Sequence, residues 1–118
     1  MTTYWLAAPE MLAQPKSYTS RVDEWSVGLT IYAMVMGWYL IQGDTELAIL
    51  TDIFRRFGTP TPAQLVEMGI DPNFTKYPGS PLKLANKKLE RICAALLKPY
   101  PKDRISCAEA YKMLFNKD

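Results

Sequence analysis

Residues 22–36 read VDEWSVGLTIYAMVM, and this stretch decides what kind of fold the chain can have. Thr19 or Ser20 can cap a helix that runs from about Arg21 to Met36. Apolar side chains cover nearly the whole circumference of that helix: Val22, Trp25, Val27, Leu29, Ile31, Tyr32, Met34, Val35 and Met36. Because a helix that is apolar on all sides belongs inside a large domain, this one is too hydrophobic for a chain of 118 residues.

The rest of the chain predicts further helices joined by loops rich in proline and glycine. Each helix begins at a capping residue, and two of them begin with a capping box. The expected elements are a short turn over Met11–Ala13 and helices from Asp44–Thr45 to Gly58, Thr61 to about Met68, Asn86 to Pro99, and Ser106 to about Phe115. No stretch alternates cleanly with period two, so the sequence predicts an all-α fold, in the simplest case a helical bundle.

Composition excludes several classes of function. The chain has no histidine and only two cysteines, so neither a Ser-His-Asp system nor a structural zinc site can be built. A net charge of +2 without a basic stripe argues against nucleic acid. The longest apolar run is too short for a membrane span, and the N-terminus lacks the basic region of a secretory signal. We expect an intracellular protein, cytoplasmic or nuclear. Cys107 would begin a helix, where the pKa of a thiol tends to fall.

Four short motifs follow one another in a specific order. They are Ala8-Pro9-Glu10, VDEWSVG at 22–28, GDTE at 43–46 followed by IFRRFGTPT at 53–61, and PKDRIS at 101–106. In this order they resemble the C-terminal half of a eukaryotic protein kinase. The 43–61 stretch resembles the CMGC group, and within it the cyclin-dependent kinases. The resemblance implies that residues 1–118 are a partial kinase domain, the helical part that runs from the end of the activation segment to the last helix of the C-terminal lobe.

The resemblance assigns structural roles to five residues. Glu10 would pair with Arg104, since a buried carboxylate needs a partner and guanidinium supplies a two-pronged one. Asp23 would hold the backbone of the catalytic loop without taking part in chemistry, while Trp25 and Gly28 would serve as anchor and close-packing site of the same helix. The plainer alternatives are that Glu10 and Arg104 are unrelated surface charges and that Asp23 is an ordinary helix cap.

Two binding regions are implied as well. The stretch from Thr3 to Ala8 resembles the loop that receives the substrate residue after the phosphorylated one. In it, Thr3 matches the threonine that bonds the catalytic aspartate and lysine, Trp5 keeps an aromatic position, and Ala7 lies where the family has arginine. Cyclin-dependent kinases use the 43–61 region to bind small regulatory subunits. The expected docking set is Gly43, Asp44, Glu46, Thr59 and Pro60.

Three departures from the family pattern affect these expectations. Ala7 replaces an arginine that shapes the pocket for a following proline, so a preference for proline at that position is not expected to carry over. Leu6 replaces the neighbouring tyrosine. Tyr100 replaces an aspartate of the turn before Arg104, which is expected to weaken the ion network around that arginine.

The parts that kinases use for chemistry are not in the sequence. There is no Gly-x-Gly-x-x-Gly, no His-Arg-Asp and no Asp-Phe-Gly, and these hold ATP and its metal ions. No catalytic, cofactor-binding or metal-binding residue is therefore assigned, and Mg-ATP is expected only in an intact parent kinase. The chain is either the C-terminal-lobe fragment of a Ser/Thr kinase, inactive alone, or a non-catalytic interaction module. Its expected partners are proteins: a substrate peptide, the remaining kinase lobe, a regulatory subunit or, through exposed apolar surface, a second copy.

Overall fold

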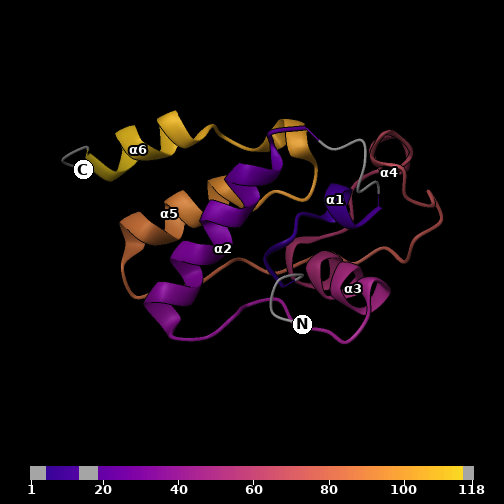
Figure 1. The fold of residues 1–118 in the computed structure, drawn as a ribbon, viewed down its shortest axis with the longest axis horizontal. Coiled ribbons are helices and arrows are strands. Elements are labelled where there is room, and N and C mark those ends of the chain that lie inside the picture. The colour runs from indigo at the N-terminus through magenta and orange to yellow at the C-terminus, as the bar shows by residue number, and fades with distance from the viewer. Residues whose placement is uncertain (1–4, 14–18, 116–118) are drawn as a thin grey trace.

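The computed structural model describes residues 5–13 and 19–115. All regular structure in these ranges is helical, as the sequence predicted, and no strand occurs in them (Figure 1). The elements are α1 (Pro9–Ala13), α2 (Val22–Met36), α3 (Glu46–Phe57), α4 (Pro62–Met68), α5 (Lys87–Leu96), the 3₁₀ helix η2 (Pro101–Asp103) and α6 (Cys107–Phe115).

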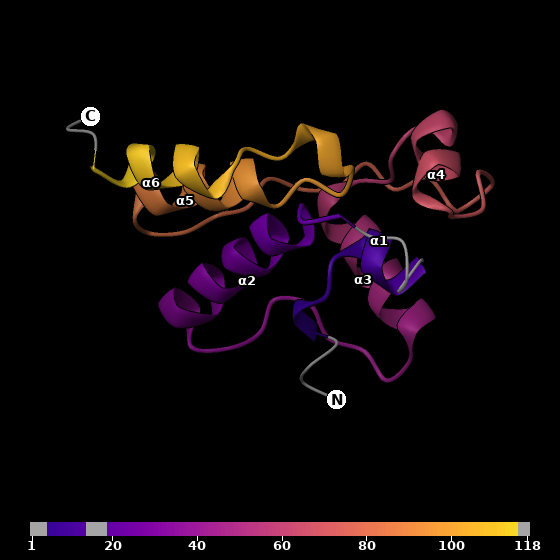
Figure 2. The same cartoon turned by 45° about the horizontal axis from the view of Figure 1, so that its top comes forward.

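Helix α2 is the element around which the others are arranged. It packs against α5, which packs in turn against α6, and α1 packs against α3. Figures 1 and 2 show α5 and α6 side by side along one flank of α2, while α1 and α3 lie beyond its N-terminal half. The loop between α4 and α5 carries three prolines, Pro72, Pro78 and Pro81, and contains no helix.

Side-chain caps begin four of the helices as predicted. The hydroxyl of Thr45 accepts from the backbone of α3, Asn86 caps α5, and Thr61 forms a complete capping box with Gln64 at α4. Ser106 and Glu109 form the reciprocal pair of hydrogen bonds that opens α6, at 3.0 and 3.1 Å. Each such cap typically contributes about 1 kcal/mol to helix stability.

The start of α2 differs from the prediction. Its N-cap is Arg21, with no side-chain cap, so neither Thr19 nor Ser20 fills that role. Instead, the carbonyls of Thr19 and Ser20 accept from Val22 and Asp23 at 3.3 and 3.0 Å. This backbone turn provides partners for amide groups that a capping side chain would otherwise bind.

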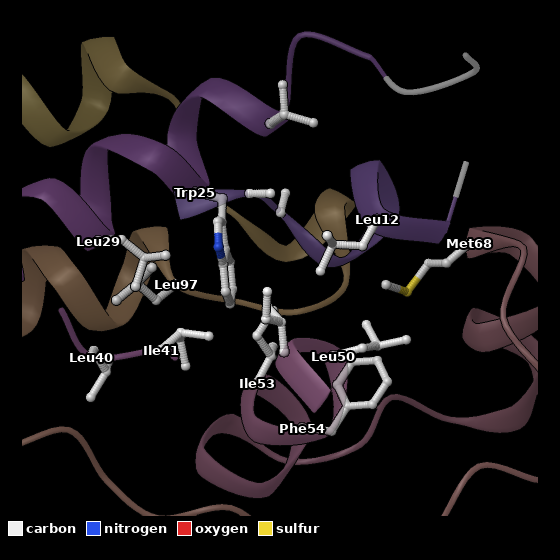
Figure 3. Close-up of a cluster of buried hydrophobic side chains, with 14 of the residues drawn as sticks. Leu12, Trp25, Leu29, Leu40, Ile41, Leu50, Ile53, Phe54, Met68 and Leu97 are labelled. Atoms are coloured by element: carbon white, nitrogen blue, oxygen red, sulfur yellow. The ribbon is translucent and has the colours of Figure 1, made fainter. Parts of the chain in front are cut away.

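The main core fills the space between α2 and α3 (Figure 3). Trp25 lies at its centre and is fully buried, with Leu29 and Leu97 on one side and Ile53 of α3 below it. The ring of Trp25 meets that of Phe57 edge to face, with 5.4 Å between centroids. Each fully buried large apolar side chain stabilises the fold by about 1.5–3 kcal/mol. The buried side chains around Trp25 therefore hold α2 and α3 together.

Not all of the apolar surface of α2 is covered. Only Val22, Trp25, Gly28 and Leu29 of this helix are buried. Val27, Met34, Val35 and Met36 are exposed, Met34 to 80%, and Trp38 just after the helix is exposed to 62%. These five residues are called the exposed α2 face below. The expectation that this helix is too apolar for its chain is therefore confirmed in the described ranges.

Gly28 lies where α2 and α5 come closest together. A Cβ atom placed on it would stand 2.8 Å from Cγ of Leu97 and 3.1 Å from Cβ of Leu96. Leu97 is itself buried, so it has little space to move into. Gly28 is thus a close-packing position, as the sequence analysis expected.

Replacing Gly28 with alanine is expected to lower the free energy of unfolding by up to about 2 kcal/mol. Overpacking typically costs about 1–3 kcal/mol, and the better helix propensity of alanine returns about 1 kcal/mol. Urea unfolding followed by circular dichroism measures the change. Thr30→Ala, at an exposed position of the same helix, is the matched control, and equal stability of the two variants would contradict the close-contact explanation.

Candidate functional site

Glu10 and Arg104 form a buried ion pair that joins the two ends of the chain. Glu10 lies in the first turn of α1, and its two carboxylate oxygens accept from Nη1 and Nη2 of Arg104 at 2.6 and 2.8 Å. The Arg104 side chain is completely buried and that of Glu10 nearly so. Two parallel charge-assisted bonds fix both the distance and the plane of the pair, so the two residues are not unrelated surface charges.

Backbone carbonyls occupy the remaining donors of Arg104. Its guanidinium donates to the carbonyls of Arg21, Lys98 and Pro99 at 2.9, 2.7 and 3.2 Å, and it lies 5.1 Å from the ring centroid of Trp25. All five N–H groups thus have a partner, and the network joins α1, α2 and the turn after α5. The replacement of an aspartate by Tyr100 was expected to weaken the ion network around Arg104. In the structure no N–H group of this guanidinium lacks an acceptor, because three backbone carbonyls accept from it besides Glu10.

Tyr100 makes a different contact that the sequence analysis missed. Its hydroxyl donates to Oε2 of Glu67 at the end of α4, and the same carboxylate oxygen lies 3.1 Å from Nζ of Lys102. The Tyr100 hydroxyl, and then Lys102, lower the pKa of the Glu67 carboxyl. Because 33 residues separate Glu67 from Tyr100, no local pattern could have indicated this link.

Two long-range hydrogen bonds hold the stretch from Trp5 to Ala8, the described part of the expected substrate loop. The hydroxyl of Ser26 on α2 donates to the carbonyl of Leu6 at 3.1 Å. The indole nitrogen of Trp5 donates to the carbonyl of Gly43 at 3.0 Å, and its ring meets that of Tyr39 edge to face. The stretch is therefore attached to α2 and to the loop before α3.

The side chains of this stretch differ in what they can offer a ligand. Ala7 and Ala8 are buried, so the methyl group of Ala7 packs inside and presents no polar group outside. Trp5 and Leu6 are half-buried. The assignment of Thr3 falls outside the described residues.

Asp23 lies in the first turn of α2 with its side chain exposed. Within the described ranges its carboxylate accepts no hydrogen bond from the helix backbone, so it does not act as the ordinary cap of the alternative hypothesis. Val27, one turn along, is exposed as well. Asp23 and Val27 together leave one edge of α2 open to a further segment, and the role of Asp23 toward a catalytic loop stays a prediction.

The structure does not bring the expected docking residues together. Gly43, Asp44 and Glu46 lie at the N-terminal end of α3, and Thr59 and Pro60 follow its C-terminal end. A helix of 12 residues separates the two groups by about 18 Å. A contact that includes all five residues would therefore have to extend along the length of α3.

The two groups also differ in their surroundings. Asp44 and Glu46 are exposed, whereas Pro60 is buried. Thr59 is bound to the loop before α5: its hydroxyl donates to the carbonyl of Thr75 at 2.7 Å and accepts from the amide of Tyr77 at 2.9 Å. Thr59 and Pro60 thus contribute to the fold, and Asp44 and Glu46 are the exposed members of the expected docking set.

Cys107 does not have the lowered pKa that its place at a helix start suggested. Partial burial and the nearby Glu24 carboxylate raise the pKa of its thiol, which donates to Oε2 of Glu24 at 3.6 Å. Burial raises the pKa of the other thiol, Cys93, to about 11. A negative charge beside a thiol disfavours the thiolate, which here outweighs the helix terminus.

Replacing Glu24 with glutamine is expected to speed alkylation of Cys107 by iodoacetamide. Removing the negative charge lowers the pKa of the thiol, so the reactive thiolate becomes more populated at about pH 8, and the rate rises roughly three- to tenfold. Mass spectrometry of the labelled peptide over time gives the rate. Cys93 serves as an internal reference that stays unlabelled in folded protein, and an unchanged Cys107 rate would show that burial alone sets its pKa.

Other kinds of site were sought in the same ranges. No group of three or more Cys, Asp or Glu side chains in residues 5–13 and 19–115 could hold a metal ion. None of the helices described there has both the length and the apolar character of a membrane span. One cavity in the described part of the chain, of about 520 Å³, lies beside α3 and the 69–77 loop, and another, of about 390 Å³, lies at the C-terminal end of α3.

Comparison with known proteins gives a consistent result. The sequence pattern of the protein kinase domain matches residues 1–116. A probable cyclin-dependent kinase 9 of Schizosaccharomyces pombe is 32% identical over 125 residues, which cover 93% of this chain and 20% of that protein. The cell division control protein 2 homolog 3 of Trypanosoma brucei brucei is 33% identical over 120 residues, 93% of this chain and 39% of that protein. A probable serine/threonine-protein kinase KIN28 homolog of Encephalitozoon cuniculi is 34% identical and similarly covered. The chain thus spans between a fifth and two fifths of the length of these curated relatives.

Proposed function

Because this chain belongs to the protein kinase family, among its cyclin-dependent-kinase-like CMGC members, we propose that it is the C-terminal-lobe part of a Ser/Thr protein kinase. In that role residues 1–118 form a partial kinase domain that presents the substrate loop and supports the catalytic loop. They do not transfer phosphate by themselves. In the intact parent, phosphoryl transfer from ATP to protein would be the activity.

The observation that carries this proposal is the fixed position of the stretch from Trp5 to Glu10. The Glu10–Arg104 pair anchors its C-terminal end, and Ser26 and Gly43 bind its N-terminal half. A loop held at both ends is preorganised, so it loses little conformational entropy when a peptide binds. Asp23 is exposed on α2 three residues before Ser26, which binds this stretch, and so is available to support a catalytic loop.

The described residues do not fit Mg-ATP. They contain no acidic cluster for a metal ion, and no glycine-rich phosphate loop occurs in the sequence. We therefore assign the nucleotide and its metal to parts of a parent kinase outside these residues. The contribution of this chain is positional: it orients a peptide and holds the backbone that surrounds it.

A chimera tests the proposal. The segment of the Trypanosoma brucei brucei relative that matches this chain is replaced by residues 1–118, and peptide phosphorylation is measured with Mg-ATP. We expect activity above that of the relative without any such segment. The chain alone should show neither kinase activity nor a thermal shift with Mg-ATP, and activity of the pure chain would overturn the assignment of a non-catalytic part.

The control is the same chimera with Asp23→Asn. Asparagine keeps the size of the side chain and loses its charge, so an exposed residue of this kind should leave folding intact. If Asp23 supports the catalytic loop, kcat falls while the melting temperature stays close to that of the parent chimera. A folded chimera with no activity in either form would favour the second candidate function.

That second candidate is a non-catalytic protein-interaction module. The specific observation in its favour is the exposed α2 face, since leaving such side chains in water forgoes about 1.5–3 kcal/mol each. A partner kinase lobe or a second copy of the chain could cover it. Light scattering of the purified chain distinguishes these cases, because self-association gives a molar mass that rises with protein concentration. A monomer that melts cooperatively and binds no apolar dye would show that the α2 face is not exposed in solution and would count against this candidate.

The partners proposed for the chain are proteins. One of the relatives is named a probable cyclin-dependent kinase, so we propose a cyclin-like regulatory subunit as a partner, with the exposed Asp44 and Glu46 at the start of α3 as the contact. Such partners place the protein in the cytoplasm or the nucleus. No nucleic-acid or membrane partner is proposed.

A further inference from the structure

The cavity of about 390 Å³ at the C-terminal end of α3 combines positive charge with an apolar lining. The positive side chains at its wall are Arg55, Arg56 and Lys83, and the apolar part includes Tyr32, Phe57 and Leu82. None of these residues belongs to the Trp5–Glu10 stretch, to the Arg104 network or to the expected docking set. The cavity is thus a separate feature of the fold.

Asp52 holds the two arginines in place. Its nearly buried carboxylate, one turn earlier on α3, accepts from Nη2 of Arg55 at 3.0 Å and from Nε of Arg56 at 3.4 Å. Oδ2 of Asp52, which accepts from Arg56, also accepts from the backbone N–H of Gln42 at 3.3 Å. An aspartate bound on three sides keeps both guanidinium groups at one wall of the cavity, so they are preorganised.

Both arginines retain donors for a ligand. Arg55 and Arg56 are about half exposed or more, and the described part of the structure gives neither Nη atom of Arg56 a partner. Three positive side chains line the cavity, and in the described residues the two arginines share the single carboxylate of Asp52, so the arginine wall carries a net positive charge. The Glu90 carboxylate lies near Lys83 and offsets part of the charge of that lysine, while it also accepts from the backbone amide of Leu84 and pairs with Lys87. The net positive charge of the cavity is therefore located mainly at Arg55 and Arg56.

We propose that this cavity binds a segment of a partner protein that carries a phosphorylated serine or threonine next to a large apolar side chain. The apolar side chain would enter against Phe57 and Leu82. The phosphate would lie between the two arginines, and Lys83 would approach it from the other wall.

Charge complementarity favours phosphate over a carboxylate. A phosphate monoester carries a charge of about −1.5 to −2 at neutral pH and three acceptor oxygens, which suits a cavity lined by two guanidinium groups and a lysine. Arginine binds phosphate through two parallel N–H groups, and the Nη1 and Nη2 atoms of Arg56 provide such a pair. A carboxylate carries a smaller charge and offers only two acceptor oxygens.

Fluorescence anisotropy with a labelled probe tests the proposal on the 118-residue chain. The probe is a fluorescein-labelled Ala-Leu-phosphoserine-Ala-Gly peptide. We expect it to bind about tenfold more tightly than its unphosphorylated form and than a form with glycine in place of leucine. Arg56→Gln should weaken the binding about tenfold, and Lys83→Gln by a smaller factor.

The controls separate this site from general attraction between charges. Lys112→Gln removes one positive charge from an exposed position on α6 and should leave the affinity unchanged. Lys83→Gln does not touch Asp52, so it keeps the test valid if Arg56→Gln unfolds, which circular dichroism detects. Equal weakening by Lys112→Gln, or no weakening by Lys83→Gln, would overturn the proposal.

Two further outcomes concern the identity of the ligand. If inorganic phosphate displaces the probe at the concentration at which the unlabelled phosphopeptide does, the site is one for free phosphate and the peptide proposal is wrong. If the peptide with aspartate in place of phosphoserine binds as tightly as the phosphopeptide, the proposal that the cavity recognises a phosphorylated residue is wrong. These results do not depend on kinase activity, so they can fail or succeed independently of the proposed function.

Discussion

Replacing Arg104 with methionine is expected to lower the free energy of unfolding by about 3–5 kcal/mol. The change leaves the Glu10 carboxylate buried without its partner, and it removes five hydrogen bonds that join α1, α2 and the turn after α5. It also removes the charge beside the Trp25 ring. Since small domains have about 5–15 kcal/mol of stability in total, the variant should be largely unfolded well below the melting temperature of the parent chain.

A double-mutant cycle separates the stranded charge from the lost packing. Glu10→Leu combined with Arg104→Met removes both charges, and replacing a buried ion pair by apolar groups can be nearly neutral. We therefore expect the double variant to be more stable than Arg104→Met alone, as measured by urea unfolding. Lys102→Met, which breaks a solvent-exposed pair, is the control and should change little. If Arg104→Met lowers the free energy of unfolding by no more than Lys102→Met does, the role assigned to the Glu10–Arg104 pair is contradicted.

The second large effect is expected at Trp25. Replacing it with alanine should cost about 3–5 kcal/mol, since it opens a cavity at the centre of the core between α2 and α3. The ring contact with Phe57 and the stacking surface beneath Arg104 are lost as well. Thermal and urea unfolding, followed by circular dichroism because the main fluorescent residue of the core is removed, measure the change.

Trp25→Phe is the informative comparison for this position. The indole Nε1 of Trp25 is buried without a hydrogen-bond partner in the described part of the chain, and such a group costs about 1–3 kcal/mol. Phenylalanine removes that group while it keeps an aromatic ring, so its loss of stability should be clearly smaller than that of alanine. Equal losses for phenylalanine and alanine would show that a smaller aromatic ring does not replace the packing of the indole at this position.

The stability of this network has a direct relation to the proposed function. Arg104 lies 94 residues from Glu10 along the chain, yet it fixes the helix that follows the substrate-loop stretch. A variant that weakens the pair should therefore loosen the Trp5–Ala8 stretch before it unfolds α5 and α6. Hydrogen exchange of the Leu6 to Glu10 amides would report this order.

Helix starts were predictable because their causes lie within a few residues. Thr45, Thr61, Asn86 and Ser106 cap their helices through bonds to residues three positions away. The prediction of a side-chain cap was wrong at the start of α2, because a backbone turn begins that helix. The expectation for Cys107 failed for a related reason, since Glu24 approaches it from another helix.

The site shows the same division. The order of the motifs allowed Glu10 to be matched with Arg104, and the structure contains that pair. The docking set was predicted as parts of one region, 43–61. In the structure its two groups lie at opposite ends of α3. The contact of Tyr100 with Glu67 and the arginine wall of the smaller cavity depend on residues that have no shared local pattern.

The sequence by itself thus determined the all-α class, the capped helices, the family resemblance and the excess apolar surface of α2. The fold class, the caps and the apolar surface depend on composition or on neighbours within one or two helical turns, where the chain geometry is known in advance. The family resemblance depends on the order of short motifs along the chain, which can be seen in the sequence directly. Only the tertiary structure decided which carbonyls satisfy Arg104, why Gly28 has no room for a methyl group and which charges surround each cavity. Those contacts join residues far apart in the chain, and their positions depend on how the helices pack, which no local rule specifies.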